Sequence, residues 1–395
     1  MKQTLWIISE LFPPEETSTG YIMGEIANAM VAKYNVKVIA GPEVYDKNKK
    51  SDGNSTFHLD ESIEVSRVKT VGEDKSSKLS RIRKFLLMSW NLYRMARRKI
   101  SNGDKVLMVT NPFPLIVLMG HMRRHRDIRL CMLVHDIMPE SLYTDISIPQ
   151  TVYPLVERVF NKAYSSTDLL ISIGRDMKEI LEKKCKGFVH QPEIEVVENW
   201  GDVEGVVPKV RESGDRVVIQ YAGNIGNAQG VGEFVDVFRE AECENVLFSI
   251  WGTGVAEADI KRKVEGYGMQ DSVRFNGPYF RSQQTDVLND CDIALVRLVE
   301  GMYGLGVPSK SYNIIAAGKP ILFVGNPESE VALMIKEAGI GYCFDNGDTD
   351  GLIGFLRGLT SIDRAELAEM GRKARTLAEE KYSKNIILNK FLELV

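Results

Sequence analysis

The stretch VVIQYAGNIGNAQGVGEFVDVFREA, residues 217–241, runs from an apolar segment through a glycine-rich turn into a helical pattern. A short apolar run rich in β-branched residues predicts a buried strand, and apolar residues spaced three and four apart predict a helix. Glycine lets the backbone approach another group closely, and free amides at the start of a helix attract anions. The stretch therefore predicts a strand–turn–helix unit, whose turn either binds a phosphate or is only a tight connection.

The same alternation continues on both sides of this stretch. Further strands are expected before it at 5–9, 36–41, 106–111, 129–136, 168–174 and 195–200. Others are expected after it at 246–252, 273–277, 292–298, 319–325 and 341–344. Strands separated by helices pair in parallel through right-handed crossovers. The pattern predicts an α/β protein of two doubly wound, Rossmann-like units.

The segment 201–216 is polar, contains glycine and proline, and is the best linker candidate. We place an N-terminal domain at 1–203 and a C-terminal domain at 204–379, with the last helix, about 380–395, packing back on the first domain. A chain of 395 residues suits two domains. Two such units facing one another would form a cleft at the carboxyl ends of both sheets, where open α/β folds bind ligands.

Composition excludes several classes of protein. The net charge of −4 argues against nucleic-acid binding, and the five scattered cysteines disfavour a disulfide framework or a zinc site. There is no apolar run of 18 residues, no apparent secretory signal, and no HExxH, GxSxG or P-loop motif. We expect a cytoplasmic protein that stays reduced.

Charge is distributed unevenly along the chain. Residues 1–200 carry 29 basic and 25 acidic side chains, whereas residues 201–395 carry 21 and 29. The stretch KLSRIRKFLLMSWNLYRMARRKIS, residues 78–101, has eight basic residues, interleaved aromatics and no acidic residue. A basic helix with aromatics suits an anionic membrane surface. The alternatives are a solvated basic face over a packed apolar face and, less favoured, a nucleic-acid contact.

The stretch LVRLVEGMYGLGVPSKSYNIIAAGKPILFVG, residues 295–325, joins two strands through a glycine-rich loop and a helix. Pro308 and Ser309 open the helix, so Lys310 lies in its first turn and Asn313 lies on the same face. A cation there opposes the helix dipole, a cost that a bound diphosphate would reverse. The alternative is a solvated lysine.

Three further sites lie at strand ends. Gly252 and Gly254 form a Gly-x-Gly turn, Tyr279 offers a ring to a planar group, and His135 and Asp136 lie at the end of the strand expected at 129–136. Each also has an ordinary interpretation as a turn, a loop aromatic or a structural histidine. The Asp290/Asp292 and Asp348/Asp350 pairs could hold Mg²⁺, but the first resembles a helix end entering a strand and the second a polar turn.

Taken together, the sequence resembles the GT-B retaining glycosyltransferases of glycosyltransferase family 4, and among them those of bacterial capsule, O-antigen and colanic-acid synthesis. The resemblance covers nearly the whole chain. It is carried by LFPPEETSTG (11–20), ENW (198–200), YAGNIGNAQG (221–230), the Gly-x-Gly turn, VPSKSYNIIAAGKP (307–320) and the order of the strands.

The resemblance implies a nucleotide-sugar donor on the C-terminal domain and an acceptor mostly on the N-terminal domain. It implies that Gly20 lets the donor approach and that Gly223, Asn224 and Gln229 form the first phosphate turn, together with the Gly-x-Gly turn. Lys310, with Ser309 beside it and Arg297 as a second cation, would neutralise the diphosphate. Tyr279 would receive the base, Asn313 the ribose, and His135 or Asp136 the transferred sugar or acceptor hydroxyl.

The sequence departs from the family pattern at three places. Asn224 and Gln229 stand where many members have an arginine and a lysine, and Asn313 stands where many have a ribose-binding glutamate. These departures put individual residue roles in doubt more than the function.

The resemblance implies transfer with retention, without a metal or another cofactor. Uridine diphosphate is the first choice of carrier and guanosine diphosphate the second. The expected acceptor is a polyprenyl-diphosphate-linked saccharide, reached from the inner face of the membrane by a peripheral protein that binds through 78–101. The alternatives are a GT-B UDP-sugar 2-epimerase and a non-catalytic nucleotide-sugar-binding subunit.

Overall fold

The computed structural model describes residues 2–15, 17–43, 57–69, 78–144, 149–209, 211, 214, 216–359 and 364–395. The chain divides into a first unit of residues 1–197 and 388–395 and a second unit of residues 198–387. The division therefore falls after Val197, whereas the sequence placed it after residue 203. The last helix, α13 (Lys384–Leu394), begins in the second unit, and its residues from Leu388 onward belong to the first.

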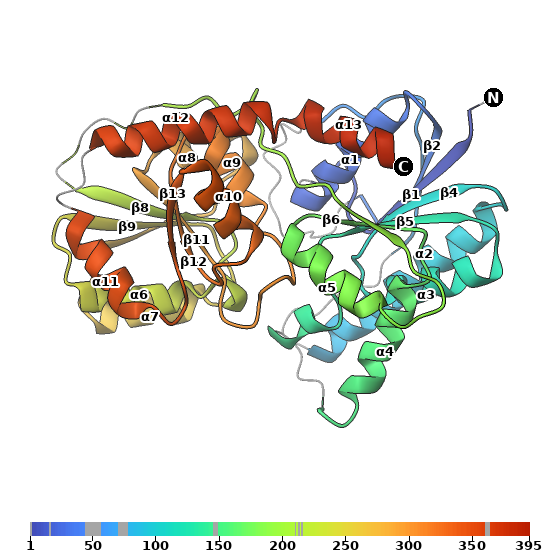
Figure 1. The fold of residues 1–395 in the computed structure, drawn as a ribbon, viewed down its shortest axis with the longest axis horizontal. Coiled ribbons are helices and arrows are strands. Elements are labelled where there is room, and N and C mark those ends of the chain that lie inside the picture. Colours follow the sequence, from blue (N-terminus) through green and yellow to red (C-terminus); the bar gives the residue numbers. More distant parts are fainter. Residues whose placement is uncertain are drawn as a thin grey trace. The chain divides into compact units, whose positions relative to one another are not determined.

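The first unit is built on a seven-stranded parallel sheet in the order β3-β2-β1-β4-β5-β6-β7 (Figure 1). Its strands are β1 (Thr4–Ser9), β2 (Asn35–Ala40), β3 (Glu64–Arg67), β4 (Lys105–Val109), β5 (Arg129–Val134), β6 (Leu169–Ser172) and β7 (Glu193–Val196). β3 was not predicted, because this short edge strand has no apolar run. The strand order reverses between β1 and β4, where doubly wound sheets bind ligands at the carboxyl ends.

Helices cover this sheet because their apolar faces bury against it. They are α1 (Ser18–Met30), α2 (Lys78–Lys99), α3 (Pro114–His125), α4 (Tyr153–Tyr164) and α5 (Arg175–Cys185), with the short helix η1 (Glu140–Thr144) before α4. α3 packs between α2 and α4. In the part of the chain that the structure describes, no helix is both long and apolar enough to cross a membrane.

The second unit repeats the design with a six-stranded parallel sheet in the order β10-β9-β8-β11-β12-β13. Its strands are β8 (Val217–Ala222), β9 (Val246–Trp251), β10 (Val273–Gly277), β11 (Ile293–Arg297), β12 (Ile321–Val324) and β13 (Gly341–Phe344). Its helices are η2 (Asn227–Gln229), α6 (Val231–Ala241), α7 (Glu257–Gly266), η3 (Arg281–Gln283), α8 (Gln284–Asn289), α9 (Lys310–Ala316), α10 (Glu330–Ala338), α11 (Thr349–Gly358) and α12 (Arg364–Glu380). Here the order reverses between β8 and β11.

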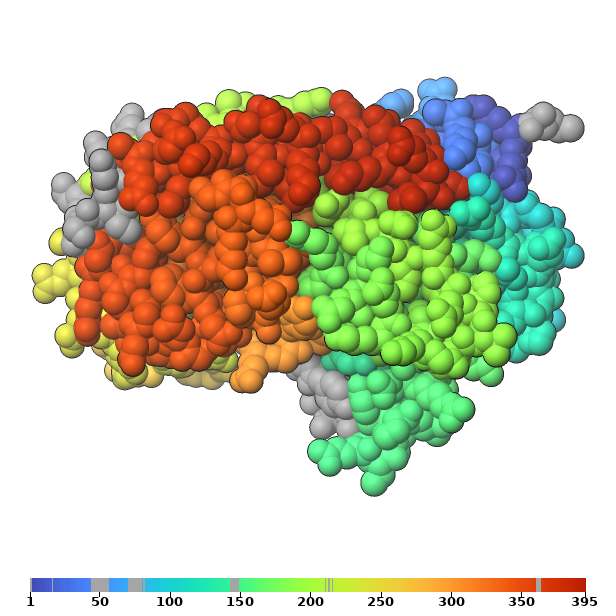
Figure 2. Space-filling view, viewed as in Figure 1, coloured from blue at the N-terminus to red at the C-terminus, as the bar shows by residue number. Residues whose placement is uncertain are grey.

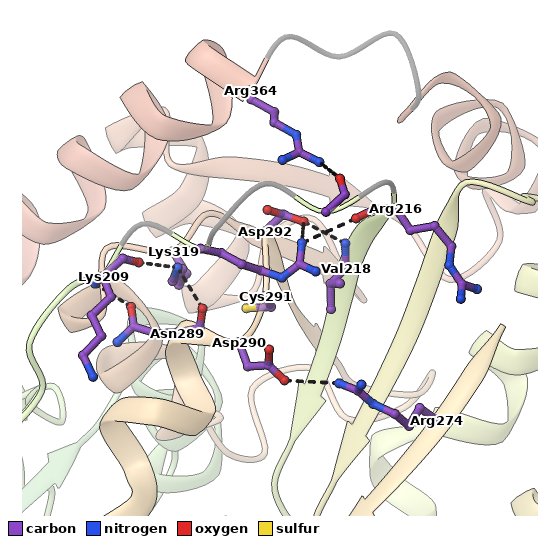
Figure 3. Close-up of polar contacts among 12 residues, drawn as sticks. Lys209, Arg216, Val218, Arg274, Asn289, Asp290, Cys291, Asp292, Lys319 and Arg364 are labelled. Atoms are coloured by element: carbon purple, nitrogen blue, oxygen red, sulfur yellow. Dashed lines mark hydrogen bonds and ion pairs between the residues drawn. The ribbon is translucent and has the colours of Figure 1, made fainter. Parts of the chain in front are cut away.

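The predicted linker is bound to the second unit along much of its described length (Figure 3). The side chain of Asn289 accepts a hydrogen bond from the Lys209 amide at 2.7 Å. It also donates one to the Val207 carbonyl at 2.9 Å. The buried Lys319 ammonium donates to the Lys209 carbonyl at 2.9 Å. These contacts make residues 207–209 part of the second unit rather than a free connection.

The Asp290/Asp292 pair belongs to the same network, in which each carboxylate pairs with an arginine. Asp292 accepts hydrogen bonds from Arg211 at 2.9 Å and from the Val218 amide at 2.8 Å, while Asp290 pairs with Arg274 at 3.2 Å. Both lie at the edge where β8 and β11 begin, opposite the carboxyl ends of the strands. In the second candidate pair, Asp348 caps α11 by accepting from the Gly351 amide.

Replacing Asp292 tests how strongly this network stabilises the second unit. Asp292→Ala leaves the Val218 amide without its acceptor and leaves the half-buried Arg211 guanidinium with a long contact to the Arg216 carbonyl, at 3.4 Å. We therefore expect a loss of about 2–3 kcal/mol in the free energy of unfolding, measured with urea. Asp286 pairs with Lys209 in an exposed ion pair. Asp286→Ala is therefore the matched control and should cost at most about 1 kcal/mol. Equal losses in the two variants would contradict the structural role of Asp292.

Candidate functional site

Two loops of the second unit are joined backbone to backbone at the carboxyl ends of β8 and β9. The Gly223 amide donates to the Trp251 carbonyl at 3.0 Å, and the Ile225 amide donates to the Thr253 carbonyl at 2.9 Å. The Gly252 amide donates onward to the Gly277 carbonyl at the end of β10, at 2.7 Å. This ladder continues the sheet beyond its strands and fixes the glycine-rich turn.

The Gly-x-Gly turn requires glycine at both positions, because the two loops lie too close together for a side chain to fit between them. Gly252 has a φ of +120°, and a Cβ there would lie 1.9 Å from the Gly223 carbonyl oxygen. A Cβ at Gly254 would lie 2.2 Å from the Ile225 carbonyl oxygen. Gly223 differs, because the atoms that a Cβ would approach are those of the Lys310 side chain, at 3.7 Å. The two turns are thus held together, and one of them lies against Lys310.

Lys310 is a buried amine above an aromatic ring. Its Nζ lies 3.5 Å from the centroid of the Tyr221 ring, has almost no contact with solvent, and has no hydrogen-bond partner among the described residues. Burial lowers the pKa of Lys310 to about 7. The hydroxyl of Tyr221 donates to the Asn224 carbonyl at 2.5 Å, so the ring under the amine is itself tied to the turn. A buried cation with so few partners favours an anionic ligand.

The polar residues of the first turn mostly serve the turn itself. Gln229 accepts a hydrogen bond from the Gly226 amide at 3.1 Å, and the side chain of Asn224 is exposed. A Cβ at Gly226 would contact both side chains. The Gln229 side chain therefore stabilises the loop by bonding to its backbone, whereas the Asn224 side chain is exposed to solvent.

Arg297 is bound within its own unit rather than left free beside Lys310. Its guanidinium, 6% exposed, donates to the Gly230 carbonyl at 2.5 Å and to the carboxylate of Glu233. These contacts hold the start of α6 against the end of β11. Its predicted part in sharing the charge of a diphosphate stays a prediction, and the guanidinium already has a carboxylate partner.

Asn313 also has a structural partner. Its Oδ1 accepts from the Asp202 amide at 2.9 Å, and Asp202 pairs in turn with Arg281 at 3.1 Å. The amide oxygen expected to meet a ribose is thus bound to the segment that enters the second unit. Ser309 stands directly before α9, and its side chain does not cap the helix.

Two aromatic rings meet at the ends of β9 and β10. Tyr279 lies edge-on to Trp251, with ring centroids 6.2 Å apart, and burial raises the pKa of Tyr279. The Trp251 indole nitrogen is buried and has no partner among the described residues. Trp251 was not predicted as a site residue, although its position as the last strand residue before the Gly-x-Gly turn could have identified it as a candidate.

In the first unit, polar groups gather at the carboxyl ends of β1, β4 and β5. The buried Thr110 hydroxyl accepts from the amides of His135 at 3.2 Å and Asp136 at 3.4 Å. The buried carboxylate of Glu10 accepts from the Asn111 side chain at 3.2 Å. These three strands are adjacent, and the strand order reverses between β1 and β4. Thr110, Asn111 and Glu10 were not predicted, although they lie at the ends of expected strands.

The two predicted catalytic groups of this unit differ in electrostatic setting. Burial lowers the pKa of His135 to about 4, and its Nε2 has no partner among the described residues. The Asp136 side chain reaches solvent, yet the protein around it displaces enough water to raise its pKa to about 6. At neutral pH, His135 is therefore uncharged and Asp136 is mainly ionised.

Gly20 lies near the start of α1 and has a packing reason of its own. A Cβ there would lie 2.7 Å from the Glu15 carbonyl oxygen and 3.0 Å from the Thr17 hydroxyl, which caps the helix by accepting the Gly20 amide. The loop that precedes α1 thus folds directly onto this glycine. Its predicted part in admitting the donor stays a prediction.

Comparison with known proteins identifies relatives over the whole chain. No protein-family model matches. The chain is 30% identical to the probable glycosyltransferase WbjE of Pseudomonas aeruginosa, over 99% of this chain and 97% of WbjE. It is also 23% identical to WcaI of Escherichia coli, over 48% of this chain and 46% of WcaI. WcaI is described as a putative colanic acid biosynthesis glycosyl transferase.

Solved structures share the fold at low sequence identity. Sucrose-phosphate synthase from Thermosynechococcus elongatus matches with a TM-score of 0.74 and 12% identity over 100% of this chain and 98% of its own. Anabaena Alr3699/HepE in complex with UDP matches with a TM-score of 0.68 and 15% identity over 100% and 99%. Both support the predicted GT-B class of fold. With this fold and its match to WbjE along nearly the whole of both chains, the protein belongs to the glycosyltransferase family that includes WbjE.

Proposed function

We propose that this glycosyltransferase moves a sugar from a uridine-diphosphate sugar, with retention at the anomeric carbon, to a lipid-linked saccharide in surface polysaccharide biosynthesis. It would then act as a member of glycosyltransferase family 4, with the donor on the second unit and the acceptor on the first. The observation that carries the proposal is the buried Lys310 amine beside the glycine-rich turn.

The setting of Lys310 suits a diphosphate. Burying an amine without a hydrogen-bond partner costs free energy, and the pKa of about 7 shows that this cost falls on the charged form. A diphosphate placed against Gly223 would supply the missing acceptors and favour the ammonium. Arg297 and Lys319, two other buried cations of the unit, already have oxygen partners, so Lys310 is the group best placed to bind an anion.

Two rings and one structural relative support the proposed nucleoside. Trp251 offers a buried indole N–H, and Tyr279 offers a ring beside it. The Alr3699/HepE structure contains UDP. Uridine diphosphate is therefore the first choice, and guanosine diphosphate is the second.

In the proposed reaction, negative charge grows on the leaving diphosphate as its bond to the sugar breaks. A fixed ammonium at that position stabilises the transition state more than the ground state, which raises the rate. The leaving phosphate takes the proton of the acceptor hydroxyl, so neither an enzymic nucleophile nor a metal is required. The neutral His135 and the mainly ionised Asp136 would bind and orient the sugar or acceptor hydroxyl.

The acceptor proposal rests on α2 and on the named relatives. α2 has eight Lys and Arg residues and no acidic one, which suits the anionic lipids of an inner leaflet. WcaI is named for colanic acid biosynthesis. We therefore propose a polyprenyl-diphosphate-linked saccharide as acceptor, and a cytoplasmic enzyme that binds the inner face of the membrane peripherally.

Calorimetry with uridine, guanosine, adenosine and thymidine diphosphates tests the donor site directly. We expect tight binding of the uridine ligand and a loss of about tenfold or more in Lys310→Met, because one charge-assisted contact is removed. Lys336→Met changes an exposed lysine of the same unit and is the control. If no nucleotide binds the wild-type chain, the donor site is wrong and a non-catalytic role gains weight.

The pH dependence of that binding follows from the lowered pKa of Lys310. Above pH 7 the free amine is mainly neutral, whereas the bound diphosphate would hold it protonated, so binding takes up about one proton. Affinity should therefore fall by about tenfold per pH unit between pH 7.5 and 9. Calorimetry in buffers of different ionisation enthalpy measures the proton uptake. The same uptake in Lys310→Met would assign it to another group.

Thr110 provides a test of the first unit. Thr110→Val keeps the shape of the side chain but removes the acceptor for the His135 and Asp136 amides, so the turn that carries both groups should lose its orientation. We expect kcat for sugar transfer to fall about tenfold or more, with little change in uridine diphosphate affinity. Thr110→Ser restores the hydroxyl and should restore kcat. A Val variant with wild-type kcat would exclude a positioning role.

A further inference from the structure

Large apolar side chains are exposed on one part of the first unit. Six are exposed in the portion of this unit that the structure describes, and five of these lie on α2 or along α4. They are Leu86 and Trp90 on α2, and Val152, Leu155 and Val159 along α4. The sixth, Val189, lies in the loop after α5. Large exposed apolar groups gathered in one region commonly mark an interaction surface.

The α4 side chains form a ridge. Val152, Leu155 and Val159 are spaced by three and four residues, so they follow one stripe of the helix, while Phe160 and Ala163 are buried. Leu155 is 67% exposed, more than either neighbour in the ridge. Figure 2 shows this part of the chain standing out from the rest of the first unit.

α2 presents a comparable stripe with charge added. Leu86 and Trp90 are exposed, and so are Arg83, Arg94 and Arg97, which follow the same spacing along the helix. The helices are also joined by a row of aromatic rings, of which the Phe160 ring is buried. Phe113 at the start of α3 lies 5.4 Å from Phe85 of α2 and 6.4 Å from Phe160 of α4, between ring centroids. Each outer ring is next in sequence to an exposed apolar residue, Leu86 or Val159.

The charge of these helices identifies the kind of partner. α2, α3 and α4 together contain twelve Lys and Arg residues and one acidic residue, Glu157. The whole chain has fewer basic than acidic residues, 50 against 54. A second copy of this surface would bring like charges together. An anionic lipid leaflet accepts both the cations and the apolar side chains.

We propose that α4 is a second membrane contact, in which the Val152–Leu155–Val159 ridge enters the acyl boundary of an anionic leaflet while α2 supplies most of the charge. The inference rests on the proposed membrane association of α2 and adds an inserting element to it. Electrostatic attraction weakens with salt, whereas burial of an apolar ridge does not. The two contributions are thus separable by experiment.

The experiment is flotation of the full chain with vesicles of phosphatidylglycerol and phosphatidylethanolamine, beside vesicles of phosphatidylcholine alone. Leu155→Glu should lower the bound fraction on anionic vesicles by about tenfold or more, because it places a charge where an apolar side chain would be buried. Val189→Glu changes an exposed valine elsewhere in the unit and should bind like the wild type. In 0.5 M salt the wild type should retain part of its binding, and Leu155→Glu should retain none.

Three outcomes would overturn the inference. If Leu155→Glu binds anionic vesicles as strongly as the wild type does, the membrane contact is limited to α2. If the wild type does not bind anionic vesicles, membrane binding is excluded altogether. A wild-type dimer that Leu155→Glu dissociates, seen by light scattering, would make the ridge an interface between copies. Circular dichroism and nucleotide binding of the variant show whether it is folded. Nucleotide binding does not depend on vesicles. It therefore also distinguishes a failure of this inference from a failure of the proposed donor site.

Discussion

The contact between Gly223 and Gly252 determines where the groups of the second unit's candidate site lie. A Cβ at position 252 would come within 1.9 Å of the Gly223 carbonyl oxygen. The two loops therefore approach as closely as backbones allow, and hydrogen bonds to Trp251 and Thr253 hold them there. Gly223 is kept beside the Lys310 amine in consequence. A turn of this rigidity is preorganised, so a ligand bound there would not have to order it first.

Cations of the second unit divide by whether they have oxygen partners. Lys319 donates to two carbonyls, Arg211 pairs with Asp292, and Arg297 binds a carbonyl and a carboxylate. Each of these stabilises the unit by joining segments far apart in sequence. The partner of the Lys310 amine is the face of the Tyr221 ring and not an oxygen atom. A cation–π contact of this kind is worth about 2 kcal/mol at a desolvated site. That contact does not replace the lost hydration of the ammonium, as its lowered pKa shows.

The strands and the place of Lys310 could be predicted because local pattern decides them. Buried parallel strands appear in the sequence as apolar runs. Eleven of the twelve expected strands differ from the observed ones only by small changes at their ends, as in 292–298 against Ile293–Arg297. The twelfth, expected at 195–200, is observed at Glu193–Val196. The roles of Arg297 and Asn313 were harder to foresee, because their partners Glu233 and Asp202 lie 64 and 111 residues away. Thr110 was missed for the same reason, since its hydroxyl serves the end of another strand.

The first unit shows how such a missed residue can control reactive ones. β4 and β5 are neighbours, so the residue after one strand can bind the backbone after the other. Thr110 does this with a single oxygen that accepts two amides. The acceptor is a hydroxyl and carries no charge, so it orients the His135–Asp136 turn without adding a field that would shift either pKa. Burial then lowers the pKa of His135 and the loss of hydration raises that of Asp136. Orientation and ionisation are thus governed by separate features of the same strand ends.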